Sequence, residues 1–253
     1  MLQLNGIEIT PTIFPDSTSQ VWKLDEANIK PVNRVEWDYK SDAELVQLAQ
    51  LKHLLDSYNT YTCLAIPYLP YGRQDKSISN VTTFGLYTFA SLLNSMKFSR
   101  VDILDPHSKL ALELLDNSRE ISPLPYINDA IHDCNPDTIL YPDIGAQERY
   151  LSLIPYKTSI VGRKVRNPLT GEIVEYKLGI GMLDMDITGR RILIVDDICD
   201  GGATFVLAAK CAMGVCKASE VNLYTTHGIY SRGIEYLTNN GISRIYNRKG
   251  RVI

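Results

Sequence analysis

One stretch of the chain decides the fold: Ile192-Leu193-Ile194-Val195-Asp196-Asp197-Ile198-Cys199-Asp200-Gly201-Gly202-Ala203-Thr204-Phe205. Its first four residues are apolar and three of them are β-branched, which is typical of a strand buried on both faces of a parallel sheet. We expect the strand to end at Asp196 and Asp197, because binding residues of an open α/β sheet gather where its strands end. A glycine turn and a helix that begins near Ala203 would follow.

The turn after the acid pair has the composition of a phosphate-binding loop. Gly201 and Gly202 can adopt positive φ and let the backbone approach a ligand closely. Backbone N–H groups of Asp200, Gly201, Gly202, Ala203 and Thr204 could then point at one anion, supported by the positive end of the helix dipole. The acids would serve sugar hydroxyls or a metal. The alternative is an ordinary strand-to-helix connection with acidic capping residues. The order of strand, acids, glycines and threonine favours the phosphate loop, although the loop is neither a Walker motif nor a GxGxxG motif.

Length and composition narrow the class of protein. A chain of 253 residues can hold one large or two small domains with proper cores. Its net charge of −3 gives no basic field, so we expect no nucleic-acid partner. The five scattered cysteines include no CxxC pair and fit reduced thiols in a cytosol. With no signal peptide and no membrane-spanning apolar run in the sequence, we expect a cytoplasmic protein without a membrane partner.

The first half of the chain alternates strands, helices and polar loops. Ser41-Asp42-Ala43-Glu44 has the pattern of a capping box that opens a leucine-rich helix. A strand at 62–67 leads into a loop that carries Arg73, Gln74 and Asp75, where a guanidinium could hold a polyphosphate. This loop could equally be a solvated surface loop.

A second strand of this half, at 101–104, runs into Asp105-Pro106-His107. A histidine at such a strand end is as often structural as catalytic. Near the N-terminus, Phe14-Pro15-Asp16-Ser17-Thr18 has the composition of a turn.

A soft domain boundary is expected near Pro123, which gives domains 1–122 and 123–253. The second half repeats the alternation, with a strand at 138–141, a loop at 142–146, a helix at 147–153, and strands at 156–161 and 219–224. Lys164 and Arg166 lie in the basic segment 162–172, whose poor periodicity favours a mobile flap. The alternative is a plain exposed hairpin with a solvated run of charges.

These motifs resemble known proteins at two levels. The stretch from Val195 to Thr204 resembles the ribose-5-phosphate loop of the phosphoribosyltransferase superfamily. Taken in order, the motifs of nearly the whole chain resemble those of the ribose-phosphate pyrophosphokinase family: Phe14-Pro15-Asp16, Tyr71-Gly72-Arg73-Gln74-Asp75, Leu104-Asp105-Pro106-His107, Pro142-Asp143-Ile144-Gly145, Lys164-Val165-Arg166, the ribose loop and Thr226-His227-Gly228.

The resemblance implies an α/β fold of two phosphoribosyltransferase-like domains, each a mostly parallel sheet flanked by helices. It implies transfer of the β,γ-diphosphoryl group of ATP to ribose 5-phosphate with Mg²⁺, by a homo-oligomer (dimer or hexamer). The implied site comprises ATP-binding Phe14, Asp16, Arg73, Gln74 and Asp75; metal-binding His107 and Asp143; catalytic His107, Lys164 and Arg166; and a ribose-phosphate site of Asp196, Asp197 and residues 200–204.

Several departures from the family pattern leave more than one function open. Thr18 stands where the family has an acidic residue, and Ser77-Ile78-Ser79-Asn80 replaces a basic stretch. We also expect this shorter chain to lack one N-terminal strand-helix unit of the family. The Gly201-Gly202 pair suggests a looser cup that accepts ADP-ribose, and the pattern resembles compact phage and bacterial synthetases linked to NAD salvage. Two different functions also stay open, that of a phosphoribosyltransferase and that of a catalytically silent regulatory homologue.

Overall fold

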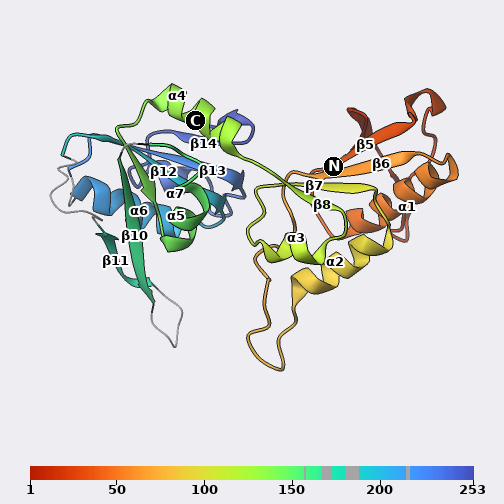
Figure 1. The fold of residues 1–253 in the computed structure, drawn as a ribbon, viewed down its shortest axis with the longest axis horizontal. Coiled ribbons are helices and arrows are strands. Elements are labelled where there is room, and N and C mark those ends of the chain that lie inside the picture. The colour runs from red at the N-terminus through yellow and green to blue at the C-terminus, as the bar shows by residue number, and fades with distance from the viewer. Residues whose placement is uncertain (157, 167–172, 180–187, 215–216) are drawn as a thin grey trace. The chain divides into compact units, whose positions relative to one another are not determined.

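A computed structural model describes residues 1–156, 158–166, 173–179, 188–214 and 217–253. The chain divides into two compact units, Met1–Ser122 and Pro123–Ile253, each with its own sheet and core (Figure 1). Within the described ranges, no helix is long and apolar enough to cross a membrane. Residues 167–172 of the predicted flap segment 162–172 fall outside them.

The first unit is built on a sheet whose described strands have the order β2-β1-β5-β6-β7-β8. The strands β5 to β8 are parallel, whereas β1 pairs antiparallel with β2 and with β5. A separate hairpin is formed by β3 and β4. The bounds are β1 Leu2–Leu4, β2 Ile7–Ile9, β3 Thr12–Ile13, β4 Ser19–Gln20, β5 Val32–Trp37, β6 Tyr61–Ile66, β7 Arg100–Leu104 and β8 Ser118–Ile121.

Three α-helices of this unit lie on one side of the β5–β8 sheet (Figure 1). They are α1 Ala43–Ser57, α2 Gly85–Ser95 and α3 Leu110–Leu114, and a short 3₁₀ turn at Glu26–Asn28 precedes β5. Side chains alternate between the faces of a strand, so every second residue of β5 to β7 faces these helices. The resulting core includes Val35, Leu64, Val101 and Ile103 from the strands and Leu48, Leu51, Leu55, Leu86, Phe89 and Leu93 from the helices.

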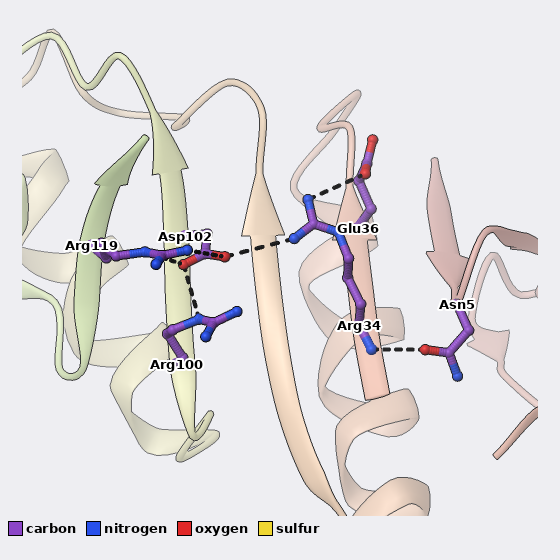
Figure 2. Close-up of polar contacts among 6 residues, drawn as sticks. All are labelled: Asn5, Arg34, Glu36, Arg100, Asp102 and Arg119. Carbon is purple, nitrogen blue, oxygen red and sulfur yellow. Dashed lines mark hydrogen bonds and ion pairs between the residues drawn. The ribbon is translucent and has the colours of Figure 1, made fainter. Parts of the chain in front are cut away.

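The alternate residues of the same strands form a polar network centred on Asp102 (Figure 2). The Asp102 carboxylate lies 3.1 Å from Nε of Arg100, 3.1 Å from Nε of Arg119 and 3.6 Å from Nη1 of Arg34. Asp102 is only 3% exposed, while the three guanidinium groups reach solvent. A buried carboxylate is tolerated here because three cations compensate it.

The predicted capping box at the start of α1 is wrong. Asp42 is the N-cap residue, but its side chain makes no capping hydrogen bond. Glu44 instead accepts hydrogen bonds from Nε1 of Trp37, from the Lys40 N–H and from the Met1 ammonium group. Tertiary partners on β5 and at the chain start therefore outcompete the local interaction that the four-residue pattern predicts.

The second unit is built on a sheet whose described strands have the order β11-β10-β9-β12-β13-β14-β15. The neighbouring strands β10, β9, β12, β13 and β14 run parallel to one another, and the edge strands β11 and β15 are antiparallel to them. The bounds are β9 Thr138–Tyr141, β10 Ser159–Arg166, β11 Ile173–Gly179, β12 Arg191–Cys199, β13 Glu220–Gly228, β14 Ile245–Asn247 and β15 Gly250–Arg251, with α4 Leu124–Cys134, α5 Ile144–Tyr150, α6 Ala203–Gly214 and α7 Glu235–Thr238.

Helices cover both faces of this sheet, which explains the uninterrupted apolar run in β12. Ile192 and Ile194 pack with residues of α6, whereas Leu193 and Val195 pack with residues of α4 and α5. All four side chains are fully buried. The predicted buried parallel strand and the mostly parallel α/β fold are confirmed.

Two local predictions need correction. The strand does not end at the acid pair, because β12 runs on to Cys199 and Asp196 pairs with Thr225 of β13. The helix predicted at 147–153 begins earlier, at Ile144, because the Asp143 side chain caps it. Of the two interpretations of 162–172, the described part fits the hairpin, since β10 and β11 pair antiparallel from Val161 to Arg166. The mobility of this segment stays a prediction.

Candidate functional site

The turn between β12 and α6 has the geometry of an anion cup. Gly202 has φ of +74°, and a Cβ at this position would lie 2.6 Å from Cδ2 of Leu237. Only glycine fits such a turn without strain or displacement of a buried side chain. In the described part of the chain, the backbone N–H groups of residues 201–204 make no hydrogen bond with the protein. They lie at the N-terminus of a 12-residue helix, where an anion finds both donors and a favourable dipole.

The acid pair lies just before this cup and is largely shielded from solvent. Asp196 is half-buried and Asp197 is 4% exposed. Burial raises the pKa of the Asp196 carboxyl well above its usual range, and the carboxylates of Asp197 and Asp143 raise it further. These three carboxylates, one just after β9 and two in the C-terminal part of β12, therefore interact electrostatically, as in a site that binds a cation or sugar hydroxyls.

The Asp143 carboxylate joins two of the predicted segments. Its Oδ1 caps α5 by accepting a hydrogen bond from the Ala146 N–H, and its Oδ2 lies 2.7 Å from Nζ of Lys164. Burial would raise the pKa of Asp143, but the hydrogen bonds from Lys164 and Ala146 hold it below the usual value. The structure thus brings Lys164 of β10 to the acids at the ends of β9 and β12. Arg166 is the last residue of the same strand.

In the first unit, two predicted segments lie at the same edge of the sheet. Arg73, Gln74 and Asp75 follow β6, and His107 follows the neighbouring parallel strand β7. A Cβ at Gly72 would lie 3.7 Å from Cβ of His107, so the two loops are in contact distance. Arg73 and Gln74 are exposed, and His107 is half-buried.

Phe14 and Asp16 lie in the turn of the β3–β4 hairpin. The turn is closed by hydrogen bonds from the Phe14 N–H to the Thr18 carbonyl and from the Ser17 N–H to the Phe14 carbonyl. Thr18 donates its hydroxyl and its N–H to Oδ1 of Asp16, at 2.7 and 3.0 Å. These two bonds lower the pKa of Asp16. The Phe14 ring is 39% exposed, so it presents an aromatic surface to solvent.

No protein-family profile matches the chain. A ribose-phosphate pyrophosphokinase of Methanothermobacter thermautotrophicus is 28% identical over 235 residues, which cover 88% of this chain and 80% of the relative. The enzyme of the same name from Pyrococcus abyssi is 27% identical over 232 residues, 90% of this chain and 79% of the relative. The chain is a relative of the ribose-phosphate pyrophosphokinases.

The fold of this chain resembles that of a solved synthetase. The phosphoribosylpyrophosphate synthetase of Mycobacterium smegmatis superposes with a TM-score of 0.75 at 18% sequence identity, covering 94% of this chain and 78% of that chain. The likeness extends over both units and shows that the two proteins share a fold.

Two arginine residues that lie beside the motifs of this chain were not predicted from the sequence. Arg149 of α5 places Nη1 3.3 Å from Oδ2 of Asp197. Arg232, in the loop after β13, lies over the glycine turn, since a Cβ at Gly201 would be 3.4 Å from its Nε. Its guanidinium carbon is 5.2 Å from the Tyr236 ring centroid, a cation–π contact that orients it. Neither residue belongs to a recognisable motif, so only the folded chain reveals them.

Among the described residues, no group of three or more His, Cys, Asp or Glu side chains is arranged to enclose a metal by itself. The acids at the ends of β9 and β12 nevertheless fit Mg²⁺, which is usually held by one or two carboxylates together with substrate phosphates. Asp196 lies beside Asp197 and Asp143, so a bound cation would offset the mutual repulsion of these carboxylates.

Proposed function

We propose that the chain is a ribose-phosphate diphosphokinase. The anomeric hydroxyl of ribose 5-phosphate attacks the β-phosphorus of ATP, the bond between that phosphorus and the α,β-bridging oxygen breaks, and AMP leaves. The observation that carries the proposal is the clustering in the second unit of Lys164, Asp143 and the acid pair, directly before an N–H cup at the start of α6. The homologues named above support the same activity.

The sugar phosphate would bind along the end of β12. The N–H groups of residues 201–204 would receive the 5-phosphate, and the Arg232 guanidinium beside Gly201 would add positive charge to the same cup. Asp196 and Asp197 would accept hydrogen bonds from the ribose hydroxyls. Arg149 would keep Asp197 oriented, because its guanidinium lies 3.3 Å from Oδ2 of that carboxylate.

Lys164 would act on the transferred group. Phosphoryl transfer requires alignment and charge neutralisation more than covalent chemistry. The Lys164 ammonium group pairs with Asp143 at 2.7 Å. We infer that it exchanges this partner for the β- and γ-phosphate oxygens when ATP is bound, with Arg166 at the end of the same strand assisting.

The first unit would supply the ATP side. Arg73 and His107 belong to adjoining loops and would hold the ATP phosphates, with Gln74 and Asp75 beside Arg73 in the chain. The exposed Phe14 would stack on adenine across a subunit interface of a homo-oligomer. We propose Asp143 in the second unit and His107 in the first each as a Mg²⁺ ligand, and bound Mg²⁺ would neutralise phosphate charge. Asp16 would contact the base. Thr18, which stands where the family has an acidic residue, donates two hydrogen bonds to the Asp16 carboxylate.

The test is AMP release from ATP and Mg²⁺ with ribose 5-phosphate, ADP-ribose or ribose as acceptor, in parallel. We expect turnover with ribose 5-phosphate, and its loss in Asp197→Asn but not in Asp137→Asn, a matched change at a carboxylate outside the site. Preferred turnover of ADP-ribose would make that compound the acceptor. Consumption of phosphoribosyl pyrophosphate with a base, and no AMP release, would indicate a phosphoribosyltransferase. No reaction by the folded protein would support a silent homologue.

A further inference from the structure

The part of the β10–β11 hairpin that carries Lys164 extends past its neighbouring strand. The last pairing between β9 and β10 joins Tyr141 to Val161, and β9 ends there. Among the described residues, β10 from Gly162 to Arg166 therefore pairs with β11 alone. A two-stranded ribbon is marginally stable by itself, so contacts outside the sheet are needed to hold this part in place.

Tyr176 of β11 supplies one such contact. Its hydroxyl donates a hydrogen bond to the Pro142 carbonyl oxygen at 3.1 Å, in the loop that follows β9. The end of the ring lies over Gly162, where a Cβ would overlap the tyrosine hydroxyl and lie 2.7 Å from the Pro142 oxygen. Burial raises the pKa of Tyr176 above its ordinary value of 10.0, so the hydroxyl stays protonated and can donate. The glycine leaves the space that this hydrogen bond requires.

The hairpin is attached to the same loop a second time, through Lys164. Tyr176 and Lys164 are paired directly across β10 and β11, and they contact consecutive residues of the loop. The hydroxyl of the tyrosine contacts Pro142, and Nζ of the lysine lies 2.7 Å from Oδ2 of Asp143. A lysine has a flexible four-carbon stem, whereas a tyrosine side chain turns about only two χ angles. The Tyr176 contact therefore fixes the spacing between hairpin and loop more closely than the Lys164 contact does.

We propose that Tyr176 is a positioning residue, whose hydrogen bond to Pro142 holds the hairpin where Lys164 can reach the transferred phosphoryl group. The inference rests on the role of Lys164 in the function proposed above. In that role the ammonium group leaves Asp143 for phosphate oxygens, so its own attachment to the loop is lost during the reaction. The Tyr176 hydrogen bond does not involve the ammonium group and persists through this exchange. Because a displacement of about 1 Å in an active site can cost about a hundredfold in rate, the remaining attachment contributes to kcat.

The test compares Tyr176→Phe, which removes only the hydroxyl, with Tyr156→Phe. Tyr156 also donates its hydroxyl to a proline carbonyl, that of Pro136, but this bond lies before β9, at the opposite end of the strand from Asp143. Tyr176→Phe should lower kcat at least about fivefold, the scale of one lost hydrogen bond, and leave the KM values for ATP and ribose 5-phosphate within about twofold. Tyr156→Phe should keep the kcat of the wild type. An unchanged kcat in Tyr176→Phe, or an equal loss in the control, would overturn the proposal.

The Lys164→Ala background separates positioning from general destabilisation. The ammonium group is absent there, so adding Tyr176→Phe should lower kcat by less than about a further twofold. A further loss as large as the loss in the wild-type background would show that the tyrosine acts independently of Lys164, and this would also overturn the proposal.

Hydrogen exchange gives a measurement that does not depend on turnover. The amides of residues 162–166 should exchange at least about fivefold faster in Tyr176→Phe than in the wild type, and at the wild-type rate in Tyr156→Phe. A folded wild type that releases no AMP would refute the proposed function, and the exchange rates would still decide whether Tyr176 holds the hairpin. Faster exchange in Tyr176→Phe would support this attachment, and unchanged exchange would overturn it.

Discussion

Replacing Asp102 by asparagine should destabilise the first unit far more than its position on the outer sheet face suggests. The substitution keeps the shape of the side chain and one acceptor oxygen but removes the charge. Three guanidinium groups would then remain around a neutral amide, with the nearest nitrogens at 3.1, 3.1 and 3.6 Å from the former carboxylate (Figure 2). Attraction would be replaced by mutual repulsion of the arginines.

The size of the effect follows from burial on one side and exposure on the other. Breaking a fully buried ion pair costs about 3–5 kcal/mol, and an exposed pair contributes about 0.2–1 kcal/mol. Asp102 is 3% exposed, but the arginine side chains are 40–56% exposed, so solvent screens part of the interaction. We expect a loss of about 2 kcal/mol. For a 122-residue unit, this lowers Tm by about 8 °C.

The measurement is thermal and urea unfolding of Asp102→Asn at low and high salt. Asp116→Asn, a change at an exposed acid of the same unit, is the control and should stay within about 0.5 kcal/mol of the wild type. Adding Arg119→Gln to Asp102→Asn should restore part of the stability, because it relieves the repulsion. A loss below about 0.5 kcal/mol, or no recovery in the double variant, would refute this account.

Three further predictions concern the second unit. Lys164→Ala should lower kcat by at least about a hundredfold with a much smaller change in the KM for ATP, and a raised KM with unchanged kcat in steady-state kinetics would contradict its catalytic role. Gly202→Ala should raise the KM for ribose 5-phosphate and should destabilise the protein more than Gly189→Ala. Both glycines have φ near +74°, which costs an alanine about 1–2 kcal/mol of strain, but of the two only position 202 has a side chain within 4 Å of the added methyl group. Equal losses on urea unfolding would speak against steric conflict. Arg191 lowers the pKa of Asp137, so this ion pair should stabilise the fold above pH 3.8, the usual pKa, and lose its effect as the pH falls below that value. The wild type should therefore exceed Asp137→Asn in unfolding free energy by under about 1 kcal/mol at neutral pH, and urea titrations in acid should show the two proteins converging. A difference that grows in acid would contradict the direction of this pH dependence.

The sequence by itself determined the fold class and the order of the motifs. Ile192 to Val195 were predicted as a strand covered on both faces because three of these four apolar residues are β-branched, and the structure places alternate side chains in two different cores. The glycine turn could also be predicted from the sequence, since the positive φ of Gly202 depends on the residue itself and on its neighbours in the chain. Local chemistry and periodicity carry this kind of information.

Only the tertiary structure decided which side chains meet. Glu44 accepts hydrogen bonds from Trp37 and Met1 instead of forming the predicted capping box. Lys164 is a strand residue whose ammonium group pairs with Asp143. Arg149 and Arg232 reach the acid pair and the glycine turn from a helix and a loop that carry no motif for this role. Such contacts join residues far apart in the chain, and their energies depend on burial and on distances that are set when the sheet and its helices pack together.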